Sequence, residues 1–157
     1  MKSFIIGLDI SSTGLRAQRI RINTIASNIA NINTTRTDEG GPYVRKEVIF
    51  SAKPMFNGKM WGVHPYISFM YPKIPVPQDN VLSGVEVYNI VDDPRPPVLK
   101  YDPYHPDADE NGYVAYPNIN TVEEMVNLIS AQRAYEANVA VASATKDITL
   151  RALEIGR

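Results

Sequence analysis

The sequence predicts an α+β fold, in which a long helix at each end of the chain flanks a small β-rich unit inserted between them. All 12 prolines of the 157 residues lie between Pro42 and Pro117, so both ends are free to be helical and the middle is not. Apolar residues recur with helical spacing at both ends, and they alternate with polar residues in several short stretches of the middle. We therefore divide the chain into an N-terminal helical segment at 1–35, a β-rich domain at 36–120 and a C-terminal helical segment at 121–157.

The C-terminal helix has start and stop signals as well as length. Thr121 and Glu124 have the spacing of a capping box, in which each side chain accepts a hydrogen bond from the backbone N–H of the other residue. Residues 122–155 contain neither proline nor glycine, and Gly156 stands where a helix is expected to stop. These signals predict one helix of about 34 residues, roughly 50 Å long at the rise of an α-helix.

Two apolar stripes run along this predicted helix. At 100° per residue, the first stripe contains Val126, Ala134, Ala137, Val141, Ala144, Ile148, Ala152 and Ile155. The second stripe contains Met125, Leu128, Tyr135, Val139, Ala142, Leu150 and Leu153. A narrow charged strip contains Arg133, Glu136, Asp147, Arg151 and Glu154. A surface helix of a small monomer needs only one apolar stripe, so two stripes predict neighbours on both sides, from this chain or from others.

The N-terminal helix is predicted over about residues 3–32 and has weaker helix-forming residues. Its heptad-like seam contains Leu8, Ser12, Leu15, Arg19, Ile22, Ala26 and Ile29. Gly7 and Gly14 each cost about 1 kcal/mol relative to alanine inside a helix, so this helix would be marginal alone. We expect packing to stabilise it, with the C-terminal helix as its partner.

Alternating apolar and polar residues predict four short strands in the middle of the chain. The strands are predicted at residues 44–50, 85–91, 98–101 and 113–116. Residues 55–80 mix aromatic residues with prolines, which suggests an irregular apolar surface, and we interpret them as a loop or small excursion that meets another surface.

Composition excludes several classes of protein. The net charge of −1, with 16 basic and 17 acidic residues, does not suggest a nucleic-acid or anionic-membrane partner. Arg16, Arg19 and Arg21 spread over about 160° of the helical wheel, which favours solvated or ion-paired roles over one basic face. Cysteine is absent, so there is no disulfide, thiol nucleophile or thiolate metal site. No stretch approaches the ~18 apolar residues of a membrane span, and we expect any export to proceed without a cleaved signal peptide.

The residues that most resemble a metal or catalytic site have simpler explanations. Residues 107–112 match the first half of an EF-hand calcium loop, but Asn118 stands where the bidentate Glu belongs. We prefer an acidic turn closed by Asn111-Gly112. Glu123 and Glu124 are adjacent, so they do not face each other on a helix, and the helix dipole and cap explain acidic residues there.

The two histidines do not belong to a recognisable site. His64 and His105 each precede proline and have no metal-ligand spacing. The sequence also has no phosphate-binding glycine loop and no nucleophile elbow. We therefore predict a protein that is not an enzyme and that uses no cofactor, no metal ion and no small-molecule substrate.

Both ends of the chain resemble the signatures of the flagellar rod, hook and related axial proteins. The N-terminal motif comprises Asp9-Ile10-Ser11, Gly14-Leu15, Ala17-Gln18-Arg19 and Ile25-Ala26-Ser27-Asn28-Ile29-Ala30-Asn31. The C-terminal motif comprises Ile129-Ser130-Ala131-Gln132-Arg133-Ala134-Tyr135-Glu136-Ala137-Asn138 and residues 152–157. Within the middle, residues 33–37, 41–43 and 101–118 resemble one member of this family, found in the proximal rod of the bacterial flagellar basal body.

The resemblance implies a fold, a function and a location. The terminal helices would pair as an antiparallel coiled coil lining the inside of a helical tube, with the β unit outside. The protein would be a structural subunit of the proximal rod in the periplasmic space, polymerising through its terminal helices into a torque-transmitting drive shaft for motility. Its implied partners are copies of itself, other flagellar rod proteins, inner-membrane ring and rod junction proteins, and the flagellar type III export apparatus.

We expect the assembly and helix-packing surface to consist of residues from the seams and the matched motifs. These residues are Leu8, Leu15, Ile22, Ala26, Asn28, Ile29, Asn31, Ala134, Tyr135, Ala137, Asn138, Val141, Ala144, Ile148 and Ile155. Among them, the three asparagines are expected to cap helices or to form hydrogen bonds between them.

Other functions are compatible with parts of the sequence. A helical-hairpin adaptor would bind a partner helix without polymerising and would saturate at a fixed small ratio. A hydrolase that used the acidic segment would depend on His105 or Asp107. A neighbouring rod or hook protein is the nearest alternative within the family, and residues 33–43 and 101–118 decide against it.

Overall fold

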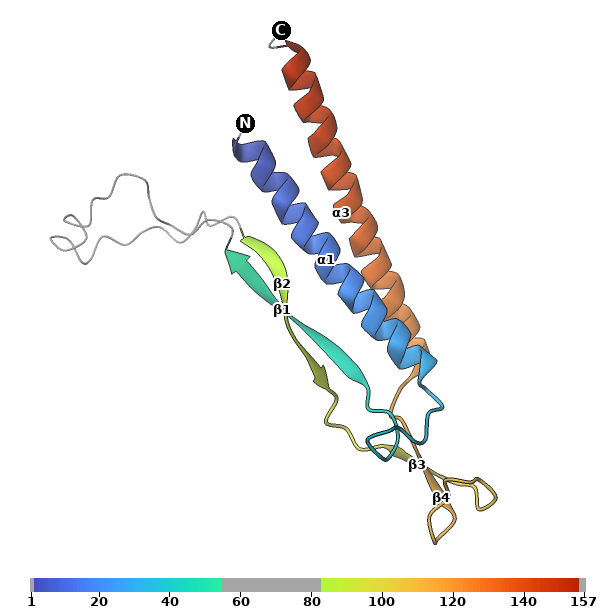
Figure 1. Ribbon diagram of the computed structural model, residues 1–157. Helices are drawn as coiled ribbons and strands as arrows, with labels where there is room; N and C mark the ends of the chain where they lie inside the picture. The colour runs from blue at the N-terminus through green and yellow to red at the C-terminus, as the bar shows by residue number, and fades with distance from the viewer. Residues whose placement is uncertain (1, 55–82, 156–157) are drawn as a thin grey trace, which may run out of the picture.

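The computed structural model describes residues 2–54 and 83–155 of the chain (Figure 1). Its elements, in chain order, are α1 (Lys2–Ala30), β1 (Lys46–Pro54), β2 (Ser83–Asp92), β3 (Val98–Tyr101), β4 (Tyr113–Tyr116) and α3 (Thr121–Ile155). The predicted α+β fold, both terminal helices and all four strands are confirmed. The irregular apolar surface predicted at residues 55–80 lies outside the described residues.

The two long helices lie side by side and antiparallel, so the start of α1 and the end of α3 are at the same end of the molecule (Figure 1). Three close approaches define their register, namely Gly7 to Thr145, Gly14 to Asn138 and Asn28 to Glu124. Residues at heptad intervals on α1 therefore meet residues at heptad intervals on α3. This is the register of an antiparallel coiled coil, and the predicted pairing is confirmed.

Helix α1 is the central element, because it packs against α3 on one side and against the hairpin of β1 and β2 on the other (Figure 1). Ala17 and Ile25 of α1 are buried, as is Ala131 of α3. The hydroxyl of Thr13 accepts a hydrogen bond from the backbone N–H of Val85 at 3.1 Å, which holds β2 against the helix. Among the described residues, the other buried apolar side chains are Val114 of β4 and Pro117, so the single chain has a small core.

The β unit consists of two separate antiparallel hairpins. β1 pairs with β2 along its whole length, and a bulge after Ile49 leaves Tyr88 without a cross-strand partner. β3 pairs with all four residues of β4. A two-stranded hairpin is marginally stable alone. The hairpin of β1 and β2 packs against α1, whereas no other described helix or strand packs against β3 and β4.

The acidic connection between β3 and β4 is a compact turn. The Asp109 carboxylate accepts hydrogen bonds from the backbone N–H of Asn111 at 2.9 Å and of Tyr113 at 2.8 Å. Gly112 has a φ of +80°, a left-handed conformation that favours glycine. The hydroxyl of Thr35 donates a hydrogen bond to the Asp107 carboxylate at 2.7 Å, which ties this turn to the loop that follows α1. The segment is thus the acidic turn that we preferred.

The predicted capping box at the start of α3 is wrong. The side-chain oxygen of Asn120 accepts hydrogen bonds from the backbone N–H of Val122 at 3.0 Å and of Glu123 at 3.4 Å, so Asn120 is the N-cap. The Glu124 side chain instead binds Arg45 and other interior groups. Because Asn120, one residue before Thr121, accepts hydrogen bonds from the first N–H groups of the helix, the Glu124 side chain is not needed at the cap and can bind interior groups.

The two glycines of the helix seam provide a matched test of the pairing. A Cβ atom on Gly14 would lie 2.8 Å from the side-chain oxygen of Asn138, whose amide nitrogen is held at 2.8 Å by the carbonyl of Ala134. A Cβ atom on Gly7 would meet only a methyl group of Thr145, at 3.8 Å. We expect Gly14→Ala to lower the free energy of unfolding by about 1–3 kcal/mol through overpacking. Gly7→Ala should raise it by up to about 1 kcal/mol through helix propensity.

Urea unfolding of the two variants, followed by circular dichroism at 222 nm, measures this difference. Equal stabilisation by both alanines would show that α1 and α3 are not packed in this register. Asn138→Ala in the Gly14→Ala background is the control, because it removes the clashing atom and should recover most of the lost stability.

Candidate functional site

In the structure, some of the predicted packing residues are buried or half-buried and others are exposed to solvent. Asn28 is fully buried. The half-buried members are Leu8, Leu15, Ile22, Ile29, Asn31, Ala134, Tyr135 and Asn138. The exposed members are Ala26, Ala137, Val141, Ala144 and Ile148. Ile155 ends α3, and its side chain lies outside the described residues.

The contact of α3 with α1 lies along one edge of the second predicted stripe and includes its members Leu128, Tyr135 and Ala142. Buried and half-buried side chains of α3 include a series at alternating spacings of four and three, namely Glu124, Leu128, Ala131, Tyr135, Asn138, Ala142, Thr145 and Thr149. This is an uninterrupted heptad seam. Most of its side chains are polar or small, which lets the helices approach closely but buries little apolar surface.

The same contact leaves large apolar side chains of both stripes exposed. Val141 and Ile148 of the first stripe are 54% and 55% exposed, and Leu153 of the second stripe is 55% exposed. The other exposed large apolar residues of α3 are Val122, Met125, Val126, Ile129, Val139 and Leu150. Extended apolar surface of this kind marks an interaction site. We refer to the exposed apolar residues of the two stripes, which include Ala137 and Ala144 but neither Val122 nor Ile129, as the assembly surface.

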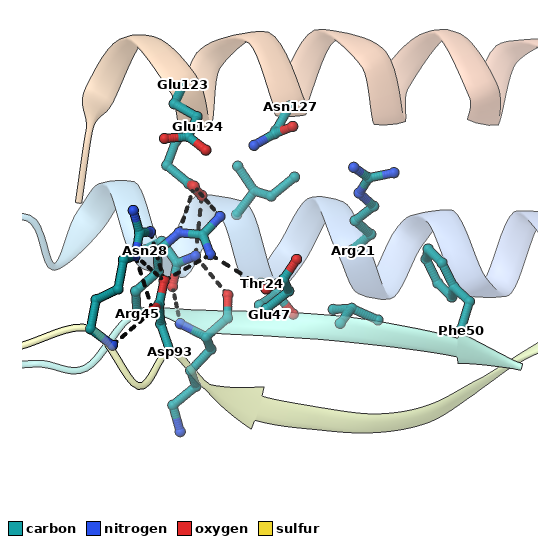
Figure 2. Close-up of a pocket in the computed structure, with 14 residues that line it drawn as sticks. Arg21, Thr24, Asn28, Arg45, Glu47, Phe50, Asp93, Glu123, Glu124 and Asn127 are labelled. Carbon is teal, nitrogen blue, oxygen red and sulfur yellow. Dashed lines mark hydrogen bonds and ion pairs between the residues drawn. The ribbon is translucent and has the colours of Figure 1, made fainter. Parts of the chain in front are cut away.

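A buried cluster of polar groups lies where α1 ends and α3 begins (Figure 2). One oxygen of the Glu124 carboxylate, which is 1% exposed, accepts hydrogen bonds from Arg45 at 2.8 and 3.0 Å. Its other oxygen accepts a hydrogen bond from the side-chain amide of Asn28 at 3.1 Å. A second carboxylate, Asp93, lies 3.3 Å from the Arg45 guanidinium. We name these four residues the polar junction.

Asn28 makes all four hydrogen bonds of which an amide side chain is capable. Its nitrogen donates to the backbone carbonyl of Lys46 at 2.9 Å as well as to Glu124. Its oxygen accepts from the backbone N–H of Lys46 at 2.9 Å and from the hydroxyl of Tyr43 at 3.1 Å. One side chain of α1 therefore holds the first residue of β1 and the first turn of α3 together.

Two arginines set the electrostatics of the junction. Side-chain and backbone hydrogen bonds from Arg95, together with the charges of Arg95 and Arg45, lower the pKa of Asp93 to about 2. Burial opposes the charge on Arg45, but the hydrogen bond and the negative charge of Glu124 outweigh burial and raise the pKa of Arg45. The charged forms of these groups therefore hold one another in place.

An open groove of about 570 Å³ lies beside the junction, between α1, α3 and β1. Figure 2 shows Arg21 pointing from α1 toward α3 in this groove, and Asn127 pointing from α3 toward α1. The carboxylates of Asp93 and Glu124 are bound to arginine side chains, as in a structural ion-pair network. The groove thus lies beside an ion-pair network that stabilises the fold.

Sequence reasoning missed the junction. It assigned Glu124 to the helix cap, and it treated Arg45 only as the polar residue of an alternating strand. The partners are 79 residues apart for Arg45 and Glu124, and 96 residues apart for Asn28 and Glu124. Local spacing contains no signal for pairs so distant in sequence.

Two further observations concern metal binding and membranes. In the described part of the chain, no three His, Asp or Glu side chains gather in a way that would hold a metal ion. Neither α1 nor α3 combines the length and hydrophobicity needed to cross a membrane.

Removing one partner of the buried ion pair should be strongly destabilising. We expect Glu124→Gln to lower the free energy of unfolding by about 2–4 kcal/mol, because it removes the most buried charge partner of Arg45 and leaves Asp93, at 3.3 Å, as the nearest one. The double variant Arg45→Met/Glu124→Leu should recover most of that loss. Urea unfolding measures both variants, and a loss below 1 kcal/mol for Glu124→Gln would contradict the assigned pairing.

The low pKa of Asp93 predicts a specific acid sensitivity. Folding lowers this pKa from 3.8 to about 2, so the stabilising contribution of Asp93 is complete above pH 4 and is lost as the pH falls toward 2. The free energy of unfolding should therefore fall more steeply between pH 4 and pH 2 for the natural sequence than for Asp93→Asn. Parallel slopes for the two proteins would rule out this role for Asp93.

Both terminal regions match families of known proteins. Residues 8–36 match the family described as flagella basal body rod protein, and residues 110–155 match the family described as flagellar basal body rod FlgEFG protein C-terminal. Three relatives named flagellar basal-body rod protein FlgC are similar over nearly the whole chain. The relative from Borreliella burgdorferi is 47% identical over 153 residues, which cover 94% of each chain.

The other two relatives come from distant bacteria. The Bacillus subtilis protein is 38% identical over 96% of each chain, and the Salmonella typhimurium protein is 34% identical over 95% of each chain. Identity at this level over almost the full length shows that this chain belongs to the FlgC family of flagellar basal-body rod proteins.

Proposed function

We propose that this chain is a non-enzymatic structural subunit of the proximal flagellar rod, which polymerises through α1 and α3 into a shaft that transmits torque for cell motility. In this proposal residues 1–35 and 121–157 are the axial helices, and the β-rich middle lies outside them. Membership of the FlgC family supports the assignment to the rod.

The observation that carries the proposal is the assembly surface of α3. Large apolar side chains are exposed from Met125 to Leu153, along nearly the whole helix, while the seam with α1 is made mostly of polar and small residues. Burying one large apolar side chain contributes about 1.5–3 kcal/mol, so packing against neighbouring subunits would add far more stability than the internal seam provides. A subunit that gains its stability on assembly is suited to a polymer.

The proposed partners follow from that role. They are copies of this chain, other flagellar rod proteins, and proteins at the junction between the rod and the inner-membrane ring. We also propose export through the flagellar type III apparatus and a final location in the periplasmic part of the rod. Neither a nucleic acid nor a small-molecule substrate belongs to this proposal.

Substitutions on the assembly surface test this function. Ala137 and Ala144 are exposed in the single chain, so Ala137→Glu and Ala144→Glu should leave the free energy of unfolding within about 0.5 kcal/mol of the natural value. Both should abolish rod assembly and swimming, because each would bury an unpaired carboxylate between subunits. The measurements are swimming in soft agar and electron microscopy of purified basal bodies.

The matched control is Ala140→Glu, because Ala140 is exposed and lies in the charged strip with Glu136 and Asp147. It should permit swimming. Normal swimming by either Ala137→Glu or Ala144→Glu would show that this face of α3 is not an interface. Saturation of the purified chain at a small fixed ratio to one partner would favour the adaptor function instead.

A further inference from the structure

The hairpin of β3 and β4 presents a rigid aromatic surface to solvent. Tyr104 is 96% exposed, Tyr101 67% and Leu99 63%. Tyr101 and Tyr113 pack edge to face with ring centroids 5.3 Å apart. A Cβ atom on Gly112 would lie 3.0 Å from the Tyr101 ring, so the turn itself supports this ring. We name these four side chains, with the turn at residues 102–112, the aromatic tip.

The aromatic tip has the features of a protein interface. Tyrosine is enriched at interface centres because it contributes a large contact area with few rotatable bonds. The rings of Tyr101 and Tyr113, which pack against each other, lose little further freedom on binding, which lowers the entropic cost of association. Four such exposed side chains on one short hairpin are therefore suited to a partner surface.

The charges around the tip define that partner surface. Residues 98–116 carry four carboxylates and one lysine, so the tip is surrounded by net negative charge. Helix α1 has the opposite balance, with three arginines and one aspartate between residues 9 and 30. Arg16 and Arg19 are exposed and form no ion pair within the described residues, whereas Arg21 lines the groove beside the polar junction. Arginine side chains stack well on exposed tyrosine rings.

These two surfaces are far apart within one chain. The β3–β4 hairpin projects past the end of the helix pair where α1 stops, at Ala30 (Figure 1). Arg19 is 11 residues before that end, which is about 16 Å along the helix axis. A contact between the tip and Arg19 would therefore form between two molecules.

We propose that the aromatic tip of one copy binds the exposed Arg16 and Arg19 face of α1 in a second copy of this chain. This inference rests on the proposed function, since it names a contact within the polymer. The contact joins two different surfaces of the same protein, so each copy can bind one neighbour through its tip and another through its α1. A heterologous contact of this kind generates an extended row of subunits instead of a closed dimer.

Disulfide trapping tests the contact, because the natural chain contains no cysteine that would interfere. The double variant Arg19→Cys/Tyr104→Cys, with an epitope tag, is expressed in an otherwise flagellated strain from which the natural gene has been deleted, and is oxidised in intact cells. The expected result is a ladder of dimers, trimers and higher oligomers of this chain on a non-reducing gel. Each single-cysteine variant should give no ladder, and Tyr104→Cys with Glu136→Cys is the matched control for an exposed site on the other helix.

The outcomes separate this inference from the proposed function. If the double variant swims before oxidation but gives no ladder, gives dimers alone, or is trapped only to a different protein, the inference is wrong and the proposed function stands. If the strain that lacks the gene swims, the proposed function itself is wrong.

Charge reversal provides a second test that does not depend on cysteine. Arg19→Glu and Glu110→Arg are both exposed substitutions, and each should reduce swimming speed or the yield of basal bodies about fivefold or more through like-charge repulsion. The combined variant Arg19→Glu/Glu110→Arg should restore most of the loss. Absence of any recovery in the combined variant would overturn the proposed contact.

Discussion

The buried ion pair of Arg45 and Glu124, completed by Asn28 and Asp93, is the constraint on which the rest of the structure depends. It joins the end of α1, the start of β1, the exit of β2 and the start of α3. Removing these charges from water is costly, and the cost is offset only when every partner is in place. The hairpin of β1 and β2 is therefore fixed relative to the helices by groups that depend on one another for their hydrogen bonds and charge partners. Such a connection suits a protein that transmits force, because the buried network holds the hairpin and the helices in one relative position.

The seam between the helices has a different physical character. Gly14 and Asn138 let the two backbones approach closely, and Ala131 is fully buried, but few large apolar side chains take part. Close approach fixes the register without supplying much hydrophobic stabilisation. The larger apolar residues of α3 remain on its open faces. Contacts within the chain thus fix the pairing of the two helices, while most large apolar side chains of α3 remain exposed and available for burial against neighbouring molecules.

The two halves of the molecule suit different contacts. The helices offer long apolar faces, which favour extended packing against other helices. The β3–β4 hairpin offers a small, rigid surface rich in tyrosine and surrounded by carboxylates, which favours a specific contact with a basic surface. The polar junction joins the helices to the hairpin of β1 and β2, and the hydrogen bond from Thr35 to Asp107 ties the β3–β4 turn to the loop that follows α1.

The sequence by itself determined both long helices, all four strands and the family. Proline distribution, helical spacing and alternation are local signals, and local signals are sufficient for element type. Only the tertiary structure decided that Glu124 is an interior ion-pair partner and that the seam follows one edge of the second apolar stripe. The contacts of Glu124 join residues that are 79 and 96 positions apart in the sequence. Contacts between residues so distant in sequence are set by the packing of whole helices and strands. The spacing of residues along the chain does not encode that packing.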